Sequence, residues 1–524
     1  MKRIVSLLII TLYLSSSLAA QEDKGEQPWS VNEATLVGAG GYNIKDSYLS
    51  PLKYTGWGLR ILNERMKMTR LANYNVSRQQ FINLDLAFTR NPAETASSFA
   101  GFADYSLGYH YHFLPDPNLK ILTGASLKGL FGFIYNTRNG NNPASAKAEI
   151  DLNLSAMAIY RLQLKEYPVT LRYQVEIPLS GVMFSPHFGQ SYYEIFNLGN
   201  NDGVVLFSSL HNKFGIRNYL TADFPVGNFT IRAGYLNSYY NTDVNGIQSH
   251  IVSHSFLIGF VKEFVSITVP IIEIMKKSIP YCLLLLVSLW LFSCEKADEY
   301  SSAPRENFEA LWKIMDEHYC FFEYKDVDWN DVYARYSVQV TDTMKQDQLF
   351  KLLGEMLNEL KDGHTNLISS FDVSRYWKWY EDYPANFSED IQENYLGTDY
   401  MIAGGMKYKK LSKDVGYIYY GSFSNAIGET NLDYILMYFK DCKAIILDVR
   451  DNGGGSLTYS DRIAARFLDN KITTGYILHK TGTGHNDFSR PYELTLIPSE
   501  RVRWLRPVVV LTNRHCFSAT NDFV

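Results

Sequence analysis

Cysteine is scarce in this sequence and is confined to its second half. The five cysteines are Cys282, Cys294, Cys320, Cys442 and Cys516, in a chain of 524 residues. The first lies in a segment predicted to be removed and the second is predicted to be lipidated, which leaves three. An odd number without metal-ligand spacing favours neither a disulfide framework nor a zinc site. No cofactor and no metal are expected.

The sequence also lacks any block of basic residues. Its 50 Lys and Arg are set against 55 Asp and Glu, so the formal net charge is -5. Domains that bind nucleic acid carry clustered basic side chains. Nucleic acid is therefore not an expected partner, and the length of the chain predicts more than one domain.

Two apolar segments are present, and the first predicts export. Residues 4–14 are apolar, follow two basic residues and lead to small residues at Ala19 and Ala20. This pattern is typical of a secretory signal peptide. Residues 1–20 are therefore predicted to be removed as the chain leaves the cytoplasm.

The second apolar segment lies inside the chain, where residues 275–294 read MKKSIPYCLLLLVSLWLFSC. Its apolar part, residues 281–292, is too short to cross a bilayer but suits a signal peptide. The segment ends in a sequence that resembles a lipobox, in which Cys294 would be lipidated. A buried helix or a short membrane anchor is the alternative.

Polar and apolar residues alternate through much of the first half. The pattern is clear in four segments, residues 82–88, 104–113, 148–156 and 169–177. A period of two predicts strands with one apolar and one polar face. Segments of eight to ten residues with aromatic-rich apolar faces favour an antiparallel transmembrane β-barrel of about 8–12 strands over a soluble β-sandwich.

The last predicted strand of this half, residues 256–264, ends in Phe264. It resembles the terminal signature that the barrel-assembly machinery recognises, and residues 21–265 resemble small outer-membrane barrels of Bacteroides-type bacteria. The resemblance implies an outer-membrane location, with outer-membrane lipid and the assembly machinery as partners. His110 and His112 share one face of a strand, and they are predicted to form a polar pair in the lumen, with a metal site as the alternative.

The second half has an α/β pattern. Residues 266–274 form a junction and 295–303 a polar linker, and helical periodicity then predicts a helical lead-in over 304–365, with Asn307 as a helix cap. An α/β core is predicted to follow over residues 366–524.

The apolar run 444–448 predicts a buried strand, and it begins the first motif that could form a catalytic site. Gly453 to Gly455 and a predicted helix from Ser456 to about Leu468 follow it. Free N–H groups at a helix start after a glycine turn can form an oxyanion hole. A phosphate loop is the alternative, but the Lys-Ser/Thr ending of the nucleotide-binding motif is missing.

A second strand and turn, residues 507–520, place Ser518 at the predicted start of a helix. This is the arrangement of a nucleophile elbow without its usual consensus. A serine in this position can also be a simple helix N-cap. The two motifs together are more specific than either alone.

Three motifs resemble those of the tail-specific (carboxyl-terminal processing) serine peptidases, a family that includes the tricorn core. They are DGHT at 362–365, LDVRDNGGG at 447–455 and LTNRHCFSAT at 511–520. The resemblance implies a serine-type endopeptidase that acts on a peptide or protein substrate. It matches Ser518 to the nucleophile, the N–H groups of Gly454 and Ala519 to the oxyanion hole, and His364 to a general base. A core or capping histidine is the alternative for His364.

The sequence departs from the family pattern in three places. The downstream lysine base of one branch would lie beyond Val524, and Gly363 stands where the other branch has a serine. About 80 residues separate the first two motifs, which leaves no room for a PDZ insert. These departures predict a compact peptidase core that is C-terminally incomplete and has doubtful activity.

Two export signals in one chain conflict, since the internal signal needs its lysines on the cytoplasmic side. We interpret the sequence as two neighbouring export genes joined by a frameshift or lost stop codon near residues 265–275. A natural fusion with a periplasmic linker over 265–303 is the alternative. Two functions follow: a lipid-anchored envelope peptidase, periplasmic or surface-exposed, and a non-enzymatic outer-membrane barrel that carries an inert peptidase fragment.

Overall fold

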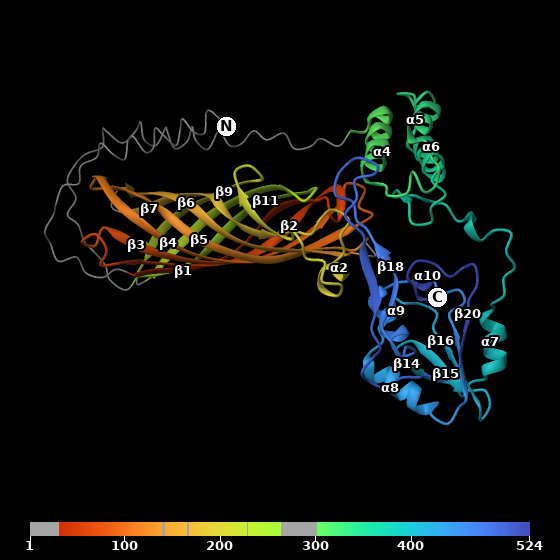
Figure 1. The fold of residues 1–524 in the computed structure, drawn as a ribbon. Coiled ribbons are helices and arrows are strands. Elements are labelled where there is room, and N and C mark those ends of the chain that lie inside the picture. Colours follow the sequence, from red (N-terminus) through yellow and green to blue (C-terminus); the bar gives the residue numbers. More distant parts are fainter. Residues whose placement is uncertain (1–30, 139–141, 165–166, 228, 264–300) are drawn as a thin grey trace.

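The computed structural model describes residues 31–138, 142–164, 167–227, 229–263 and 301–524. The predicted signal peptide, the junction, the internal signal with Cys294, and Phe264 lie outside the described residues. The described chain forms a barrel followed by a helical and α/β part (Figure 1). Each is built from the elements that the two sequence patterns predict.

Ten antiparallel strands close into the barrel, and each pairs with its neighbours until β1 meets β11. They are β1 (Val31–Asp46), β2 (Ser50–Met68), β3 (Val76–Arg90), β4 (Ser97–Asp116), β5 (Leu119–Asn136), β6 (Ala144–Leu164), β7 (Tyr167–Phe184), β9 (Lys213–Val226), β10 (Phe229–Val244) and β11 (Ile247–Glu263). The connection from β7 to β9 holds α2 (Tyr192–Phe196) and the short β8 (Val205–Ser209), which pairs with the end of β7. The barrel therefore lies within the predicted range of strand numbers.

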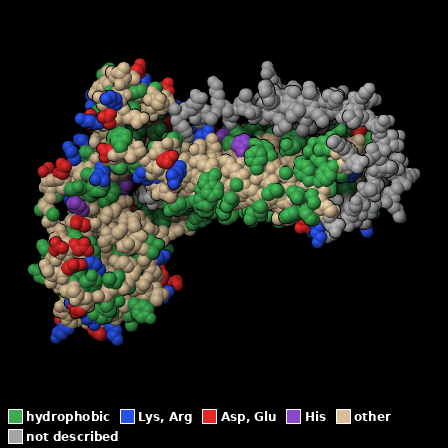
Figure 2. All heavy atoms as spheres, turned by 180° about the vertical axis from the view of Figure 1, so that it is seen from behind, with side chains coloured by type: hydrophobic (Ala, Val, Ile, Leu, Met, Phe, Trp, Pro, Cys, Tyr) green, Lys and Arg blue, Asp and Glu red, His purple; other side chains and the backbone are tan. Residues whose placement is uncertain are grey.

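The barrel places polar side chains inside and apolar ones outside. In β3, Asn83 and Asp85 are buried, whereas Ile82 and Leu84 are 44% and 47% exposed. Figure 2 shows hydrophobic side chains gathered on the outside of the barrel. A soluble sandwich buries its apolar face, so that alternative is wrong.

The barrel strands are longer than the eight to ten residues predicted. They run from 14 residues in β9 to 21 in β6. The predicted segment 104–113, for example, covers only part of β4 (Ser97–Asp116), because the length of the hydrogen-bonded ladder is set by pairing with neighbouring strands as well as by local alternation.

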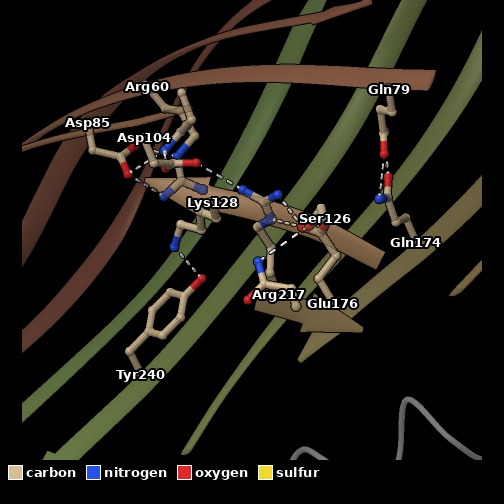
Figure 3. A network of polar contacts seen from close by, with 12 residues as sticks. Arg60, Gln79, Asp85, Asp104, Ser126, Lys128, Gln174, Glu176, Arg217 and Tyr240 are labelled. Atoms are coloured by element: carbon tan, nitrogen blue, oxygen red, sulfur yellow. Dashed lines mark hydrogen bonds and ion pairs between the residues drawn. The ribbon is translucent and has the colours of Figure 1, made fainter. Parts of the chain in front are cut away.

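Polar side chains from opposite walls bridge the lumen (Figure 3). Arg217 of β9 contacts Asp104 of β4 at 3.1 Å, although these strands are not neighbours. Gln79 of β3 and Gln174 of β7 bond each other at 2.8 and 2.9 Å. Further bridging pairs are Lys128–Tyr240, Arg172–Glu64 and Lys213–Asp151. Polar side chains thus fill much of the lumen, as expected for a narrow barrel, and leave a cavity of about 80 Å³ that is lined by Arg60, Lys128 and Glu149, among others.

Three helices lead into the second part: α4 (Pro304–His318), α5 (Trp329–Ser337) and α6 (Gln346–Asn358). They pack around Phe308, Trp329 and Met356, all fully buried or nearly so. The predicted cap at Asn307 is wrong, because Pro304 starts α4 with Ala303 as its N-cap. Proline suits the first position of a helix, where its missing N–H costs nothing. None of the helices in the described residues is long and apolar enough to cross a membrane.

A five-stranded mixed sheet forms the α/β core, in the order β14-β15-β16-β17-β20. Its strands are β14 (Met401–Ala403), β15 (Met406–Lys410), β16 (Val415–Tyr419), β17 (Ala444–Asp448) and β20 (Val508–Leu511). The helices are α7 (Glu389–Leu396), α8 (Glu429–Tyr438), α9 (Leu457–Ala464), α10 (Ala519–Phe523) and the 3-10 helix η1 (Lys378–Tyr380). Two hairpins complete it, β12 (Asn366–Ile368) with β13 (Val373–Arg375) and β18 (Ile472–Ile477) with β19 (Tyr492–Leu496).

Parallel pairing brings the two predicted motifs together. Strand β17 lies between β16 and β20 and is parallel to both, as its buried apolar run predicts. Both motifs follow the carboxyl ends of adjacent strands, so they meet at one edge of the sheet. Helix α9 ends at Ala464 rather than near Leu468, and beyond it the carbonyl of Ala465 accepts from Ser499.

Candidate active site

Ser518 occupies a backbone conformation that side chains with a Cβ rarely adopt. Its φ is 54° and its ψ is -127°, and it is the N-cap of α10. This strain costs about 1–3 kcal/mol and persists only where the surroundings impose it. The hydroxyl is not used as a cap, and Ser518 Oγ has no hydrogen-bond partner among the described residues. The turn therefore presents the hydroxyl as a sharp elbow would.

The glycine loop after β17 lies directly against this turn. Gly454 has a φ of 90°, and a Cβ at this position would lie 2.5 Å from the carbonyl oxygen of Phe517 and 2.8 Å from the Cβ of Ser518. Only glycine permits both the conformation and the close approach. The two sequence motifs thus form one compact site.

Replacing Gly454 with alanine is expected to destabilise the chain by about 1–3 kcal/mol, because the new Cβ would clash and the backbone would be strained. Urea unfolding, followed by tryptophan fluorescence, measures the loss. Gly453→Ala is the matched control, since a Cβ there meets nothing within 4 Å. Equal losses for the two variants would contradict the close packing at Gly454.

The two N–H groups assigned to the oxyanion hole differ in their partners. The N–H of Ala519 has no acceptor among the described residues. The N–H of Gly454 donates to the Oδ1 of Asn452 at 2.9 Å. The Gly454 N–H must leave this acceptor before it can bind an oxyanion.

Asn452 is a site residue that the sequence reasoning missed. It is fully buried, and its Oδ1 also accepts from the hydroxyl of Thr520 at 2.7 Å. Its Nδ2 donates to the carbonyl of Tyr420 at 2.7 Å. Asn452 therefore ties the glycine loop to the helix that starts at Ser518. The sequence feature that could have indicated Asn452 is its position directly before the glycine triplet.

His364 lies next to the serine turn but not in contact with the serine hydroxyl. Its ring stacks on Phe517 with centroids 4.1 Å apart, and its side chain is 52% exposed. Trp379 also stacks on Phe517, with centroids 5.2 Å apart. No hydrogen bond joins His364 to Ser518 among the described residues. His515, three residues before Ser518, packs on Tyr380 with ring centroids 4.2 Å apart.

Asp362, two residues before His364, holds the histidine in place. It accepts from the backbone N–H of His364 at 2.9 Å and from the hydroxyl of Tyr319 at 2.7 Å, and its Oδ1 lies 3.6 Å from His364 Nδ1. Burial alone would raise the pKa of this carboxyl, but the hydrogen bonds from His364 and Tyr319 outweigh it and hold the pKa well below its usual range. Asp362 is therefore ionised and can orient the imidazole.

A depressed pKa makes the stabilisation by Asp362 depend on pH. It is fully present above the unfolded value of about 4 and is lost as the pH falls from there towards the folded value. We expect Asp362→Asn to be less stable than the unchanged chain at pH 6, and the gap to narrow steadily below pH 4. Urea midpoints measured at several pH values test this. A gap that widens on acidification would refute it.

His110 and His112, the pair predicted to lie in the lumen, point into the barrel. His110 is fully buried and shares a hydrogen bond of 2.9 Å with Ser155. His112 shares one of 2.8 Å with Ser77. Within the described residues no group of three or more His, Cys, Asp or Glu side chains could hold a metal ion. The pair belongs to the polar lumen.

The described chain thus combines a closed barrel with a peptidase-type α/β domain. The model of a family described as a protein of unknown function (DUF3316) matches residues 5–269, half of the chain, and the chain belongs to that family. The model of peptidase family S41 matches residues 414–524, and that of the tricorn protease C1 domain matches 301–358. The second half is therefore an S41 peptidase domain with a tricorn-type helical region.

Several solved structures are similar to part of this chain. A candidate peptidase from Parabacteroides merdae is 68% identical, with 43% of this chain and 71% of that chain covered and a TM-score of 0.41. The photosystem II D1 C-terminal processing protease is 13% identical, covering 43% and 78%, with a TM-score of 0.26. The outer membrane protease OmpT from Escherichia coli is 8% identical, covering 47% and 100%, with a TM-score of 0.29. No curated protein matches the chain.

Proposed function

We propose that the chain is a cell-envelope protein in which an outer-membrane barrel accompanies a serine-type peptidase domain of the tail-specific type. Ser518 attacks the peptide carbonyl, and the N–H of Ala519, with that of Gly454 once released, stabilises the oxyanion. His364, oriented by Asp362, is the candidate base. The substrate is a peptide or protein.

One observation carries this proposal more than any other. Within the part of the chain that the structure describes, Ser518 combines a strained backbone with positive φ, a hydroxyl without a partner and an adjacent unpaired N–H on Ala519. A serine that served only as a helix cap would bond the helix through its hydroxyl. This combination supports a nucleophile rather than a cap.

A fluorophosphonate probe on the full chain in detergent tests the proposal. We expect a covalent adduct on the peptide that contains Ser518, and none in Ser518→Ala. Ser424→Ala, a surface serine change, is the matched control and should label like the unchanged chain. If the unchanged chain gives no adduct at Ser518, the enzymatic proposal fails for this chain.

The second candidate is a non-enzymatic barrel that carries an inert peptidase domain. It is favoured by the contacts of His364, which stacks on Phe517 and makes no hydrogen bond to Ser518 among the described residues. A missing base costs about 10²–10⁴ in rate. A chain that folds but does not label would support this candidate.

The outer surface of the barrel supports a membrane location. Aromatic side chains of four neighbouring strands form a continuous belt, Trp57–Phe88–Phe99–Phe133, with centroids 5.0, 5.2 and 5.5 Å apart. Such belts lie at the membrane interface in transmembrane barrels. We infer that residues 31–263 cross the outer membrane and reach it through the barrel-assembly machinery. Lipidation at Cys294 would add a lipid anchor to the peptidase domain.

A gel-mobility experiment tests the barrel separately. Folded transmembrane barrels resist detergent and migrate faster unless they are heated. We expect the chain to show this heat-dependent shift after extraction from outer membranes. Absence of a shift, with the chain in the soluble fraction, would overturn the membrane assignment without bearing on Ser518.

A further inference from the structure

The cavity in the barrel lumen lies at the end where β10 turns into β11. Its volume of about 80 Å³ is several times the roughly 10–15 Å³ that one water molecule requires. Val244 and Ile247 line the cavity beside that turn, and the bridging pair of Arg217 and Asp104 lines it deeper in the barrel. The cavity is therefore large enough for a small organic molecule rather than a single water.

The wall of this cavity carries an ammonium group that has few partners. Lys128 of β5 is 2% exposed, and its Nζ donates to the hydroxyl of Tyr240 of β10 at 2.8 Å (Figure 3). The nearest carboxylate oxygen in the described chain, Oε1 of Glu149, lies 4.0 Å from Nζ, beyond hydrogen-bond distance. Two of the three N–H groups of Lys128 therefore have no acceptor among the residues that the structure describes.

Other buried cations of the lumen have carboxylate partners at hydrogen-bond distance. Arg217 lies 3.1 Å from Asp104, and Lys213 donates to Glu149 at 2.7 Å. The charge of Glu149 is therefore already shared with a closer cation than Lys128. A buried charge is costly unless it is paired and hydrogen-bonded. An anion bound in the cavity would supply the partner that Lys128 lacks.

The hydroxyl of Tyr240 offers a second donor beside the ammonium group. It accepts from Lys128, and its own O–H has no acceptor in the part of the chain that the structure describes. Both side chains line the cavity. An anionic oxygen next to them would accept from both, and hydrogen bonds to a charged group are about twice as strong as neutral ones.

Apolar side chains form much of the remaining wall. Leu130 follows Lys128 by two residues, so it lies on the same face of β5. Leu130 and Ile251 line the cavity and pack against the buried cluster that includes Tyr42 and Phe102. An inorganic anion would leave this apolar wall against water, whereas an organic carboxylate would cover it.

We propose that the luminal cavity binds a small carboxylate that has an apolar body. The carboxylate accepts from Lys128 and Tyr240, and the body packs against Leu130 and Ile251. Because Arg217 bridges the lumen to Asp104 at the inner end of the cavity, the site binds its ligand rather than passing it through the barrel. The proposal involves no residue of the peptidase half.

Fluorine NMR on the full chain in detergent tests the site, with 4-fluorobenzoate as the probe. We expect the fluorine signal to broaden on binding and to recover when excess benzoate is added. The neutral 4-fluorobenzamide should bind at least tenfold more weakly, because it lacks the charge-assisted hydrogen bond. Equal binding of the amide, or displacement of the probe by inorganic phosphate as readily as by benzoate, would overturn the proposal.

A charge variant shows whether the probe binds at Lys128. Lys128→Met removes the ammonium group and is expected to weaken 4-fluorobenzoate binding at least tenfold. Lys262→Met, which changes an exposed lysine at the other end of β11, is the matched control and also corrects for uptake of the probe by detergent. Equal binding to the two variants would refute the assignment.

Two further variants keep the test decisive if Lys128→Met does not fold, which circular dichroism of the strands would reveal. Tyr240→Phe removes one hydrogen-bond donor and should weaken binding about fivefold. Leu130→Trp fills the cavity and should abolish binding while leaving Lys128 in place. Unchanged binding in both variants would place the probe elsewhere and overturn the proposal.

Discussion

Replacing Glu64 with alanine is expected to destabilise the barrel by about 3–5 kcal/mol, the cost of leaving a buried charge without its partner. Glu64 is almost fully buried in the lumen and pairs with Arg172 and, at 3.0 Å, with Arg232. Gln79 donates to its other oxygen at 2.5 Å. In the variant Arg232 retains its ion pair with Asp223 at 2.6 Å. The guanidinium of Arg172 therefore suffers the larger loss of a charged partner.

Urea titration of the heat-modifiable band measures this effect. Glu33→Ala is the matched control, because Glu33 pairs with Arg65 at 3.9 Å on the partly exposed outside. Such a pair contributes about 1 kcal/mol or less. Similar losses in the two variants would show that the lumen network does not stabilise the barrel as its burial implies.

Replacing Asn452 with alanine is expected to abolish fluorophosphonate labelling of Ser518 and to cost about 2–4 kcal/mol of stability. The change removes the acceptor for Gly454 and Thr520 and the donor for Tyr420. Each lost bond to a buried group costs about 1 kcal/mol or more. Without Asn452 the glycine loop and α10 lose the side chain that holds them together.

Asn330→Ala provides the control, since Asn330 is exposed at the start of α5. It should change neither labelling nor the urea midpoint by a measurable amount. Labelling that survives Asn452→Ala at the normal rate would show that Asn452 does not position the serine turn. A stability loss without a labelling loss would restrict its role to folding.

The sequence predicts those parts of the barrel that depend on local pattern. The alternation through Ile82 and Leu84 predicts strands and their two faces, because the strand period is two. It does not predict which charges meet in the lumen. Glu64 and Arg172 are 108 positions apart, and their meeting depends on barrel closure and register, which no local window contains.

The same limit applies to the candidate active site. The apolar runs predict β17 and β20, whereas the approach of Gly454 to Ser518 is predicted only by the resemblance to the tail-specific peptidases. The bond from Gly454 to Asn452 and the stacking of His364 on Phe517 depend on side-chain rotamers and on tertiary packing. Neither is encoded in spacing along the chain.

The lengths of the barrel strands bear on how far the barrel extends beyond a bilayer. A tilted strand needs about 9–11 residues to cross a bilayer, and β7 has 18. On the proposed membrane assignment, this surplus would carry the strands beyond the hydrocarbon layer. The rim next to α2 would then stand clear of the lipid as a collar of hydrogen-bonded strands.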